Sequence, residues 1–209
     1  MKVLITGATG FVGQSLVKAL GKRGHQINIL TTRKSLPKEV NGVGVESFFW
    51  NPETQEFDRN SLVGVEYIFH LAGDSIADGR WSDEKKKRLK TSRVDSFDLI
   101  LKTIKETTGK DNTIKKVISS AAIGIYGNRG DEELTEESVH GTGFLAKLCE
   151  EWESKVREVN ELNIPFVALR TGVVLDTGGG ALAKMILPFK MGCWRNLSRW
   201  ETIYELDSP

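Results

Sequence analysis

Cysteine is scarce in this 209-residue sequence, which contains only Cys149 and Cys193. The two show no metal-ligand spacing, and Cys149 falls within a helical pattern, so we expect neither a disulfide framework nor a metal site. So few cysteines fit a reducing compartment. The first residues, MKVLITGATG, enter a strand without the charged, apolar and small-residue order of a signal peptide. We therefore expect a cytoplasmic protein.

Long apolar runs and an excess of one charge are also missing. No run is long enough to cross a bilayer, and the 29 Lys and Arg residues nearly balance the 28 Asp and Glu residues. We therefore expect neither a membrane nor a nucleic acid as partner. The densest basic run, EKKKRLK at 84–90, predicts the solvated face of a helix. With 39% hydrophobic residues, the chain can bury one core and part of a second.

Apolar strand patterns alternate with helical patterns along the chain. Strands are predicted at 2–6, 27–32, 45–50, 65–73, 115–124 and 164–175, and helices at 11–22, 83–106 and 143–163. Strands rich in Val and Ile that are separated by crossover helices predict a parallel sheet covered on both faces. We expect an α/β fold with a Rossmann-type doubly wound sheet.

A change in composition at DTGGGALAK, residues 176–184, predicts the end of the core domain. We expect an NAD(P)-binding domain over residues 1–175. Residues 176–209 would begin a substrate-binding region that is partial and incomplete.

A glycine-rich turn, TGATGFVG at 6–13, follows the first strand and opens the first helix. Gly7 permits a tight turn, Gly10 lets the backbone approach a pyrophosphate, and Gly13 allows close packing of the helix on the strand. The amides of Phe11 and Val12 open the helix, whose N-terminus favours negative charge. These five residues predict a dinucleotide phosphate site, and the alternative is a glycine-rich turn without a ligand.

The second strand leads into INILTTRK, where an NAD-selective site would carry an acidic residue for the ribose 2′-hydroxyl. There is no acid. Arg33, flanked by Thr32 and Lys34, can instead bind a 2′-phosphate through charge-assisted hydrogen bonds. We therefore predict NADP(H) in preference to NAD(H), with Arg33 as an exposed loop cation being the alternative.

The sequence resembles the extended short-chain dehydrogenase/reductase superfamily. The resemblance rests on the order of TGATGFVG, HLAG at 70–73, ISSAAIGIYG at 118–127 and LRTGVVL at 169–175. More closely, it resembles the NAD(P)-dependent sugar-nucleotide epimerase-like subgroup that has a C-terminal domain of unknown function. The segments that point to this subgroup are GRW at 79–81, TSRV at 91–94, FLAKLCEEWE at 144–153 and GGGALAKMILPFKMG at 178–192.

The resemblance implies further cofactor contacts. Leu71, Ala72 and Gly73 would line the ribose on the nicotinamide side, and Arg93 would reach the cofactor from the helix after the fourth strand. For Arg93, an ion pair on the surface of a charged helix is the alternative.

The catalytic pattern of the superfamily is incomplete in this chain. Such enzymes use a Tyr four residues before a Lys, because the ammonium lowers the pKa of the phenol that exchanges a proton with the substrate. None of Tyr67, Tyr126 and Tyr204 is followed by Lys at that spacing. Lys147 is the counterpart of the Lys, which the resemblance implies would also bind the cofactor ribose, but Gly143 stands where the Tyr would be.

Substitutes for the missing proton donor come from three places. The usual hydroxyl would fall near Ala121 or Ala122, which leaves Ser120 and its neighbour Ser119 as the nearest hydroxyls. Tyr126, on the loop beyond that strand, is a second candidate, with a packing role as the alternative. Asp74 is a third candidate, with an N-terminal helix cap as the alternative. The expected catalytic set is Ser120, Tyr126 and Lys147.

The last residues break the resemblance near Gly192. Tryptophan has the single codon TGG, so Trp194 and Trp200 each force a glycine when the codons are read one base later. That frame permits GVGG and SWIH, which the subgroup would have here. We hypothesise that the sequence after about residue 191 is out of frame. The alternative is a genuine C-terminus whose apolar side chains pack on the core.

Two functions fit the sequence. The first is an NADP-dependent oxidoreductase or epimerase that transfers hydride to or from a small hydroxylated or nucleotide-sugar-like substrate. The second is a noncatalytic NADP(H)-binding sensor or structural protein, as the missing Tyr and Lys pair suggests. Homodimerisation is compatible with either function.

Overall fold

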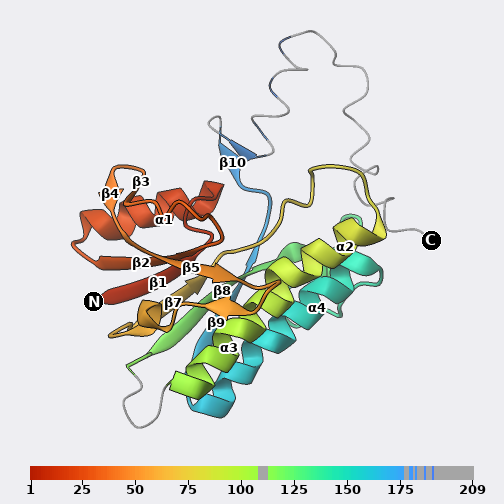
Figure 1. The fold of residues 1–209 in the computed structure, drawn as a ribbon. Helices are drawn as coiled ribbons and strands as arrows, with labels where there is room; N and C mark the ends of the chain where they lie inside the picture. The colour runs from red at the N-terminus through yellow and green to blue at the C-terminus, as the bar shows by residue number, and fades with distance from the viewer. Residues whose placement is uncertain (108–112, 177–178, 181, 183–185, 187–189, 191–209) are drawn as a thin grey trace. The chain divides into compact units, whose positions relative to one another are not determined.

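The computed structural model describes residues 1–107, 113–176, 179–180, 182, 186 and 190 (Figure 1). Residues 191–209, on which the reading-frame hypothesis depends, lie outside the described residues. In the described part of the chain, no helix combines the length and the apolar character needed to cross a membrane.

The described strands form one main sheet with the order β6-β5-β2-β1-β7-β8-β9. Its strands are β1 (Lys2–Thr6), β2 (Gln26–Thr31), β5 (Glu46–Asn51), β6 (Glu56–Phe57), β7 (Tyr67–His70), β8 (Lys116–Ala122) and β9 (Phe166–Thr171). The pairs from β5 through β2, β1 and β7 to β8 are parallel, and β6 is antiparallel to β5. Apart from β6, this is the strand order of a doubly wound Rossmann sheet, which confirms the predicted fold.

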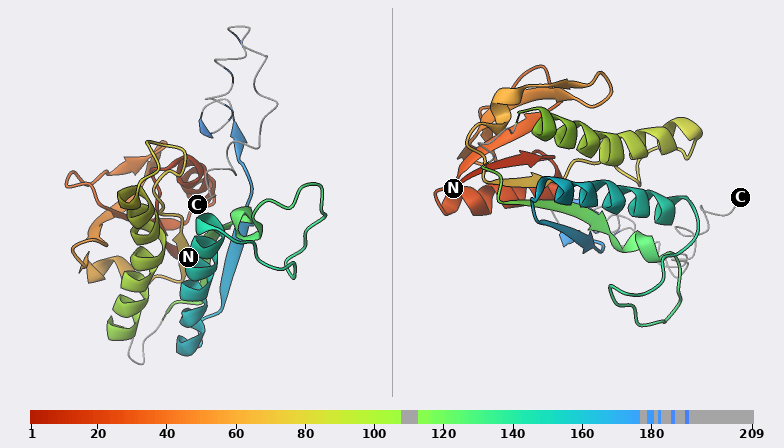
Figure 2. Two further views of the ribbon diagram at one scale, coloured as in Figure 1. Left: turned by 90° about the vertical axis from the view of Figure 1, so that its right-hand side faces the viewer. Right: turned by 90° about the horizontal axis from the view of Figure 1, so that it is seen from below.

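Helices cover both faces of the sheet. They are α1 (Phe11–Lys22), α2 (Asp83–Lys90), α3 (Ser96–Thr107) and α4 (Phe144–Arg157). Figure 2 shows α1 on one face of the sheet and α2 and α3 on the opposite face. Residues Val17 and Leu20 of α1 pack with Val3, Ile5 and the apolar residues of β2 in one buried cluster. The two-layered covering explains why the central strands are apolar on both faces.

Short elements connect these helices and strands. They are the hairpin of β3 (Glu39–Val40) and β4 (Val43–Gly44), β10 (Leu175–Asp176), and the 3₁₀ turns η1 (Arg59–Leu62), η3 (Ile123–Tyr126) and η4 (Glu158–Leu162). Because η3 and η4 are tight turns, the predicted strand at 115–124 and helix at 143–163 end earlier than expected.

The predicted helix at 83–106 is interrupted by a π-helical segment, η2 (Thr91–Asp95), between α2 and α3. The Ser92 hydroxyl donates to the Leu89 carbonyl at 3.1 Å, and the Ser96 hydroxyl donates to the Ser92 carbonyl at 2.8 Å. These side chains supply hydrogen bonds to carbonyl groups where the regular helical pattern changes. The π-helical segment also places its hydroxyl side chains at the candidate functional site.

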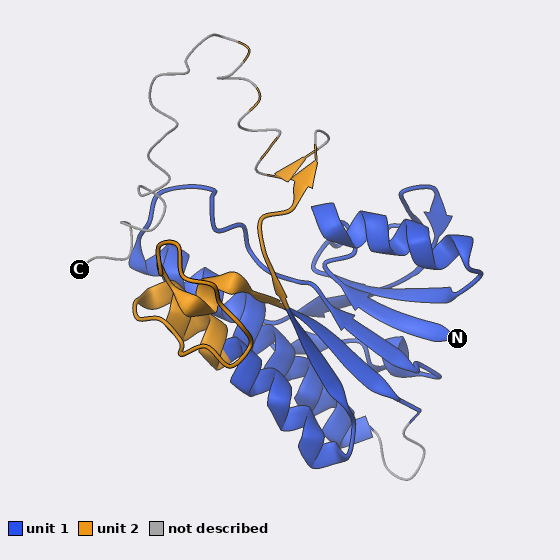
Figure 3. Ribbon diagram, turned by 180° about the vertical axis from the view of Figure 1, so that it is seen from behind, with its two compact units in different colours: residues 1–120, 152–169 blue, residues 121–151, 170–209 orange. Residues whose placement is uncertain are grey.

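The chain divides into two compact units, which Figure 3 colours separately. The first contains residues 1–120 and 152–169, and the second contains residues 121–151 and 170–209. The strands β8 and β9 and the helix α4 have residues in both units. The expected boundary near residue 175 stays a prediction.

Candidate functional site

The glycine-rich turn after β1 is shaped by two close approaches of the backbone. Gly7 has φ of +68°, and a Cβ atom there would lie 2.6 Å from the Leu71 carbonyl oxygen. A Cβ atom on Gly13 would lie 2.1 Å from the Gly7 carbonyl oxygen. Both distances are too short for any side chain. The tasks predicted for Gly7 and Gly13, a tight turn and close packing of the helix on the strand, therefore match the observed backbone.

The N-terminus of α1 opens from this turn. Gly10 is the N-cap residue and gives no side-chain cap, while its own amide donates to the Gly7 carbonyl at 2.9 Å. Phe11 and Val12, the first residues of the helix, have exposed side chains. A helix N-terminus whose amides lack a side-chain acceptor is suited to an anion.

A cavity of about 260 Å³ lies over this turn, at the edge of the sheet where β1, β2, β5 and β7 end. Its lining includes the predicted cofactor residues Gly7, Gly10, Thr32, Arg33, Ala72 and Gly73. Arg33 is exposed, and its amide donates to the Thr31 hydroxyl at 3.2 Å. The structure therefore brings the glycine turn, the basic end of β2 and the loop after β7 to one site.

Leu71 is placed differently from its neighbours. Its side chain packs against the apolar cluster of α1, β1 and β2. Leu71 lines neither this cavity nor a second cavity beside it. Its backbone carbonyl is the group that approaches Gly7. Leu71 therefore contributes to the site through its main chain.

A second cavity of about 350 Å³ adjoins the first, and Thr32, Trp50 and Ala72 line both. Its other lining residues are Asn51, Pro52, Glu53, Asp74, Arg88, Thr91, Ser92 and Ser96. Trp50, Asn51, Ser92 and Ser96 were not predicted from the sequence as site residues. The signal that points to Asn51 is its place at the end of a parallel strand, because ligands bind where such strands end.

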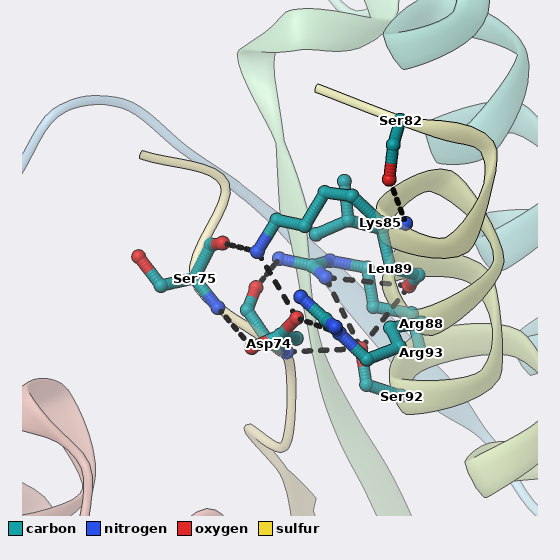
Figure 4. A network of polar contacts seen from close by, with 8 residues as sticks. All are labelled: Asp74, Ser75, Ser82, Lys85, Arg88, Leu89, Ser92 and Arg93. Carbon is teal, nitrogen blue, oxygen red and sulfur yellow. Dashed lines mark hydrogen bonds and ion pairs between the residues drawn. The ribbon is translucent and has the colours of Figure 1, made fainter. Parts of the chain in front are cut away.

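Asp74, in the loop after β7, is the centre of a polar cluster that also includes Ser75, Lys85, Arg88, Ser92 and Arg93 (Figure 4). Its carboxylate accepts hydrogen bonds from Lys85 Nζ at 3.0 Å and from Arg88 Nε at 3.4 Å. The Lys85 ammonium also donates to the Ser75 carbonyl, and the Lys85 side chain is only 3% exposed. The prediction that the basic run 84–90 is a solvated face is therefore wrong for Lys85, which is buried because a carboxylate on the facing loop pairs with it.

The charge of Asp74 bears on its suggested role as a proton donor. Partial burial opposes ionisation, but the hydrogen bond and charge of Lys85, together with Arg88, outweigh it and hold the pKa of Asp74 below its ordinary value. An ionised carboxylate is a poor general acid at neutral pH. The alternative role as a helix cap is wrong, because Ser82 caps α2 by accepting from the Lys85 amide at 3.3 Å.

Arg93 fixes the same loop from the π-helical segment. Its guanidinium donates to the Asp74 carbonyl at 2.9 Å and to the Leu89 carbonyl at 3.3 Å. The same group lies 5.5 Å from the centre of the Trp152 ring, and a Cβ atom on Gly73 would approach it to 3.1 Å. Arg93 thus holds the loop that would contact the cofactor.

The serine candidates lie on β8. Ser119 is buried and its hydroxyl donates to the Ser120 carbonyl at 2.9 Å, whereas Ser120 is half-buried. Successive side chains of a strand point to opposite faces of the sheet, so only one of the two can face a given side.

Tyr126 and Lys147 belong to the second compact unit, together with Arg170. The phenol oxygen of Tyr126 accepts from Arg170 Nη1 at 2.6 Å, and Tyr126, a residue that is 7% exposed, packs with Cys149. Lys147 is exposed on α4. Positions two apart on a helix are separated by about 200°, so Lys147 points away from the side of α4 that packs on Tyr126.

Arg170 was not selected from the sequence. Its guanidinium lies 5.2 Å from the centre of the Tyr126 ring and also donates to the Glu136 carbonyl at 3.0 Å. Among the described residues, no group of three or more His, Cys, Asp and Glu side chains is arranged to hold a metal ion.

Comparison with known proteins finds a matching family and several relatives. The profile of the NAD dependent epimerase/dehydratase family matches residues 3–178. An epimerase family protein of Mycobacterium bovis is 34% identical over 190 residues, covering 91% of this chain and 59% of the relative. The epimerase family protein SDR39U1 of Mus musculus is 31% identical over 195 residues, covering 92% of this chain and 61% of the relative. The chain thus spans about three fifths of the length of these relatives.

Two solved structures have the same fold. One is described as the nucleoside-diphosphate sugar epimerase from Corynebacterium glutamicum; it is 31% identical, with a TM-score of 0.73, and the match covers 91% of this chain and 38% of that one. The other is human SDR39U1 (isoform 2) with NADPH; it is 27% identical, with a TM-score of 0.72, and the match covers 92% of this chain and 60% of that one.

Proposed function

Because this chain belongs to the NAD dependent epimerase/dehydratase family, we propose that it binds NADP(H) in the cavity over the Gly7–Gly13 turn. We further propose that it serves an oxidoreductase or epimerase reaction on a small hydroxylated or nucleotide-sugar-like substrate. The nicotinamide cofactor supplies hydride transfer, and the protein binds and orients it.

The observation that carries the cofactor proposal is the lining of the cavity. The glycine turn and the N-terminus of α1 would hold the pyrophosphate, while Thr32 and Arg33 reach the same cavity from the end of β2. Neither these residues nor Lys34 carries a negative charge that would repel a 2′-phosphate. The NADPH in the human relative's structure is compatible with this preference.

The preference is tested by calorimetric titration of the purified protein with NADPH and with NADH. We expect NADPH to bind more tightly, and Arg33→Ala to weaken NADPH binding about tenfold, because it removes one charge-assisted contact. The affinity for NADH should stay the same. Lys18→Ala, which removes an exposed cation from α1, is the matched control and should change neither affinity. Equal affinities of the wild type, or a preference for NADH, would contradict the proposal.

For the chemical step, the candidates remain Ser120, Tyr126 and Lys147. In a reductive reaction one of these groups would deliver a proton to the substrate oxygen as hydride arrives at the carbon. Arg170 gives Tyr126 a cationic hydrogen-bond donor, which is the part that Lys plays in the usual Tyr and Lys pair. Arg170 is therefore the residue of this chain that supports Tyr126 as an acid.

A noncatalytic NADP(H)-binding function is the second candidate. It is favoured by the absence of a Tyr followed four residues later by Lys, and by the low exposure of the Tyr126 side chain. Assays of NADPH oxidation across a panel of carbonyl compounds and nucleotide sugars separate the two functions. Turnover that Tyr126→Phe abolishes supports the enzyme, and tight NADPH binding without turnover supports the sensor.

A further inference from the structure

We propose that His70 is a positioning residue, which holds the loop Leu71–Gly73 over the phosphate-binding turn through a hydrogen bond to Thr6. This inference rests on the proposed cofactor site. It concerns the described residues of the first compact unit alone.

Thr6 and His70 occupy the last positions of two neighbouring strands, β1 and β7, which pair in register there. The Thr6 hydroxyl lies 2.9 Å from His70 Nδ1. The next residue after Thr6 is Gly7 of the glycine turn, and the next after His70 is Leu71 of the loop. A hydrogen bond between the two side chains therefore links the start of the glycine turn to the start of the loop after β7, and both segments line the cavity.

The hydrogen bonds of Thr6 have a fixed direction. Its hydroxyl oxygen accepts from the Ala72 amide at 3.1 Å and from the Leu71 amide at 3.2 Å, and the Leu71 amide also donates to the Thr6 carbonyl at 3.3 Å. A hydroxyl has two acceptor lone pairs and one hydrogen, so its hydrogen is left for His70 Nδ1. We therefore assign Nδ1 as the acceptor of this bond, so that the neutral imidazole carries its hydrogen on Nε2.

The second ring nitrogen extends the chain of hydrogen bonds to the helices. His70 Nε2 lies 3.3 Å from the Ser96 hydroxyl, which itself donates to the Ser92 carbonyl at 2.8 Å. The Ser92 hydroxyl accepts from the Asp74 amide at 2.9 Å. The loop after β7 is thus held at Leu71 and Ala72 through Thr6, and at Asp74 through Ser92.

Burial keeps this arrangement in one protonation state. His70 has no exposed surface, and its ring packs edge-on against Phe97 with the ring centres 5.3 Å apart. This burial lowers the pKa of His70 to about 4, so the imidazole stays neutral at physiological pH. A neutral ring with one defined tautomer holds the Thr6 hydroxyl in one orientation.

The position of the loop matters because the cavity leaves little tolerance. The Leu71 carbonyl oxygen lies 2.6 Å from the place that a Cβ atom on Gly7 would take, and Ala72 and Gly73 line the cavity. A loop that moves toward the turn would fill the cavity, and one that moves away would lose its contact with a bound nucleotide.

The test compares His70→Leu and Thr6→Val with two matched variants. His70→Asn keeps an acceptor near the place of Nδ1, so it should preserve the bond to Thr6. Thr103→Val removes another buried threonine hydroxyl, which donates to the Leu99 carbonyl within α3. Each protein, with all 209 residues, is examined for thermal stability, NADPH affinity and hydrogen exchange of the amides of residues 71–73 without cofactor.

We expect His70→Leu to raise the Kd for NADPH about tenfold, the effect of losing one well-placed hydrogen bond. Thr6→Val should raise it at least as much, because it also removes the acceptor of the Leu71 and Ala72 amides. The double variant should be no worse than the weaker-binding single variant, because both changes break the same link. Amides of residues 71–73 should exchange faster in these variants. His70→Asn should restore affinity and protection, and Thr103→Val should reduce stability alone.

Two outcomes would overturn the inference. One is a His70→Leu protein that exchanges the amides of residues 71–73 at the wild-type rate. The other is a His70→Leu protein that loses no more NADPH affinity than Thr103→Val. A wild-type protein that binds neither NADPH nor NADH would instead refute the proposed function, and the exchange rates would still decide whether His70 holds the loop.

Discussion

At the scale of single residues, His70 makes stability depend on pH. Its pKa is lowered to about 4 in the folded protein by burial, against 6.5 in an unfolded chain. Between these values the unfolded chain binds a proton that the folded chain does not, so acidification favours unfolding.

We expect the free energy of unfolding to fall by about 3 kcal/mol through this group as the pH drops from about 6.5 to about 4. Urea titrations of the wild type and His70→Asn across this range give the free energy of unfolding at each pH. The effect of His70 is the difference between the two proteins in how steeply this free energy changes with pH. Carboxylates contribute equally to both proteins and cancel. Identical pH dependence of the two proteins would rule out a buried, neutral imidazole.

The ion pairs of Asp74 could not be predicted from the sequence. Asp74 stands directly after HLAG, and the sequence suggested a proton donor or a helix cap. Its real partners, Lys85 and Arg88, come from a helix that begins nine residues later, and local spacing does not reveal which lysine of a basic run turns inward. A buried ammonium requires a carboxylate partner, and that pairing is a tertiary property.

At the scale of elements, the packing of α1 on β1 depends on Gly13. A Cβ atom there would lie 2.1 Å from the Gly7 carbonyl oxygen, and the nearby backbone of Ala8 leaves no room to shift. We expect Gly13→Ala to destabilise the protein by about 3 kcal/mol and to reduce NADPH affinity, because the helix must move off the turn.

Gly44→Ala is the matched control for this change. A Cβ atom on Gly44 would meet nothing within 4 Å, and the residue lies in the β3–β4 hairpin away from the turn. Chemical denaturation should find it within about 1 kcal/mol of the wild type. If both alanine variants lose the same free energy of unfolding, the close approach at Gly13 does not contribute to stability.

Elements with strong periodicity were predictable, and their interruptions were not. Leu89, Val94, Phe97, Leu101 and Ile104 are all buried, as the predicted helix at 83–106 requires. At the π-helical segment within this helix, the Ser92 and Ser96 side chains donate hydrogen bonds to carbonyl groups. Serine side chains can do so in a regular helical turn as well as in a widened one, so these two serines do not reveal the interruption. The glycine turn was predictable because its function depends on short-range geometry.

At the scale of the whole molecule, β9 forms the end of the described sheet order and exposes apolar side chains. Val167 and Leu169 are 38% and 49% exposed on the same face of this strand. An apolar edge strand favours association with another chain.

We expect the protein to associate as its concentration rises, and Leu169→Lys to shift it toward monomer in sedimentation velocity. Val63→Lys is the control, since Val63 is 64% exposed on a connecting segment away from β9. Sedimentation that is unchanged by Leu169→Lys would place any self-association on another surface.

The fold class, a doubly wound parallel sheet, could be predicted because Val- and Ile-rich strands alternate with crossover helices. The grouping of Ala121–Glu151 with the chain after Arg170 could not. Contacts such as that of Arg170 with Tyr126 join residues 44 positions apart, and no periodic pattern records them.

Trp50 has a consequence of an optical kind. Its indole is buried at the end of β5, beside Phe57, and lines both cavities at the candidate site. The emission of indole overlaps the absorption of a reduced nicotinamide, so a bound NADPH would quench the fluorescence of Trp50 by energy transfer. A fall in Trp50 fluorescence on addition of NADPH would therefore report occupancy of the proposed cofactor site.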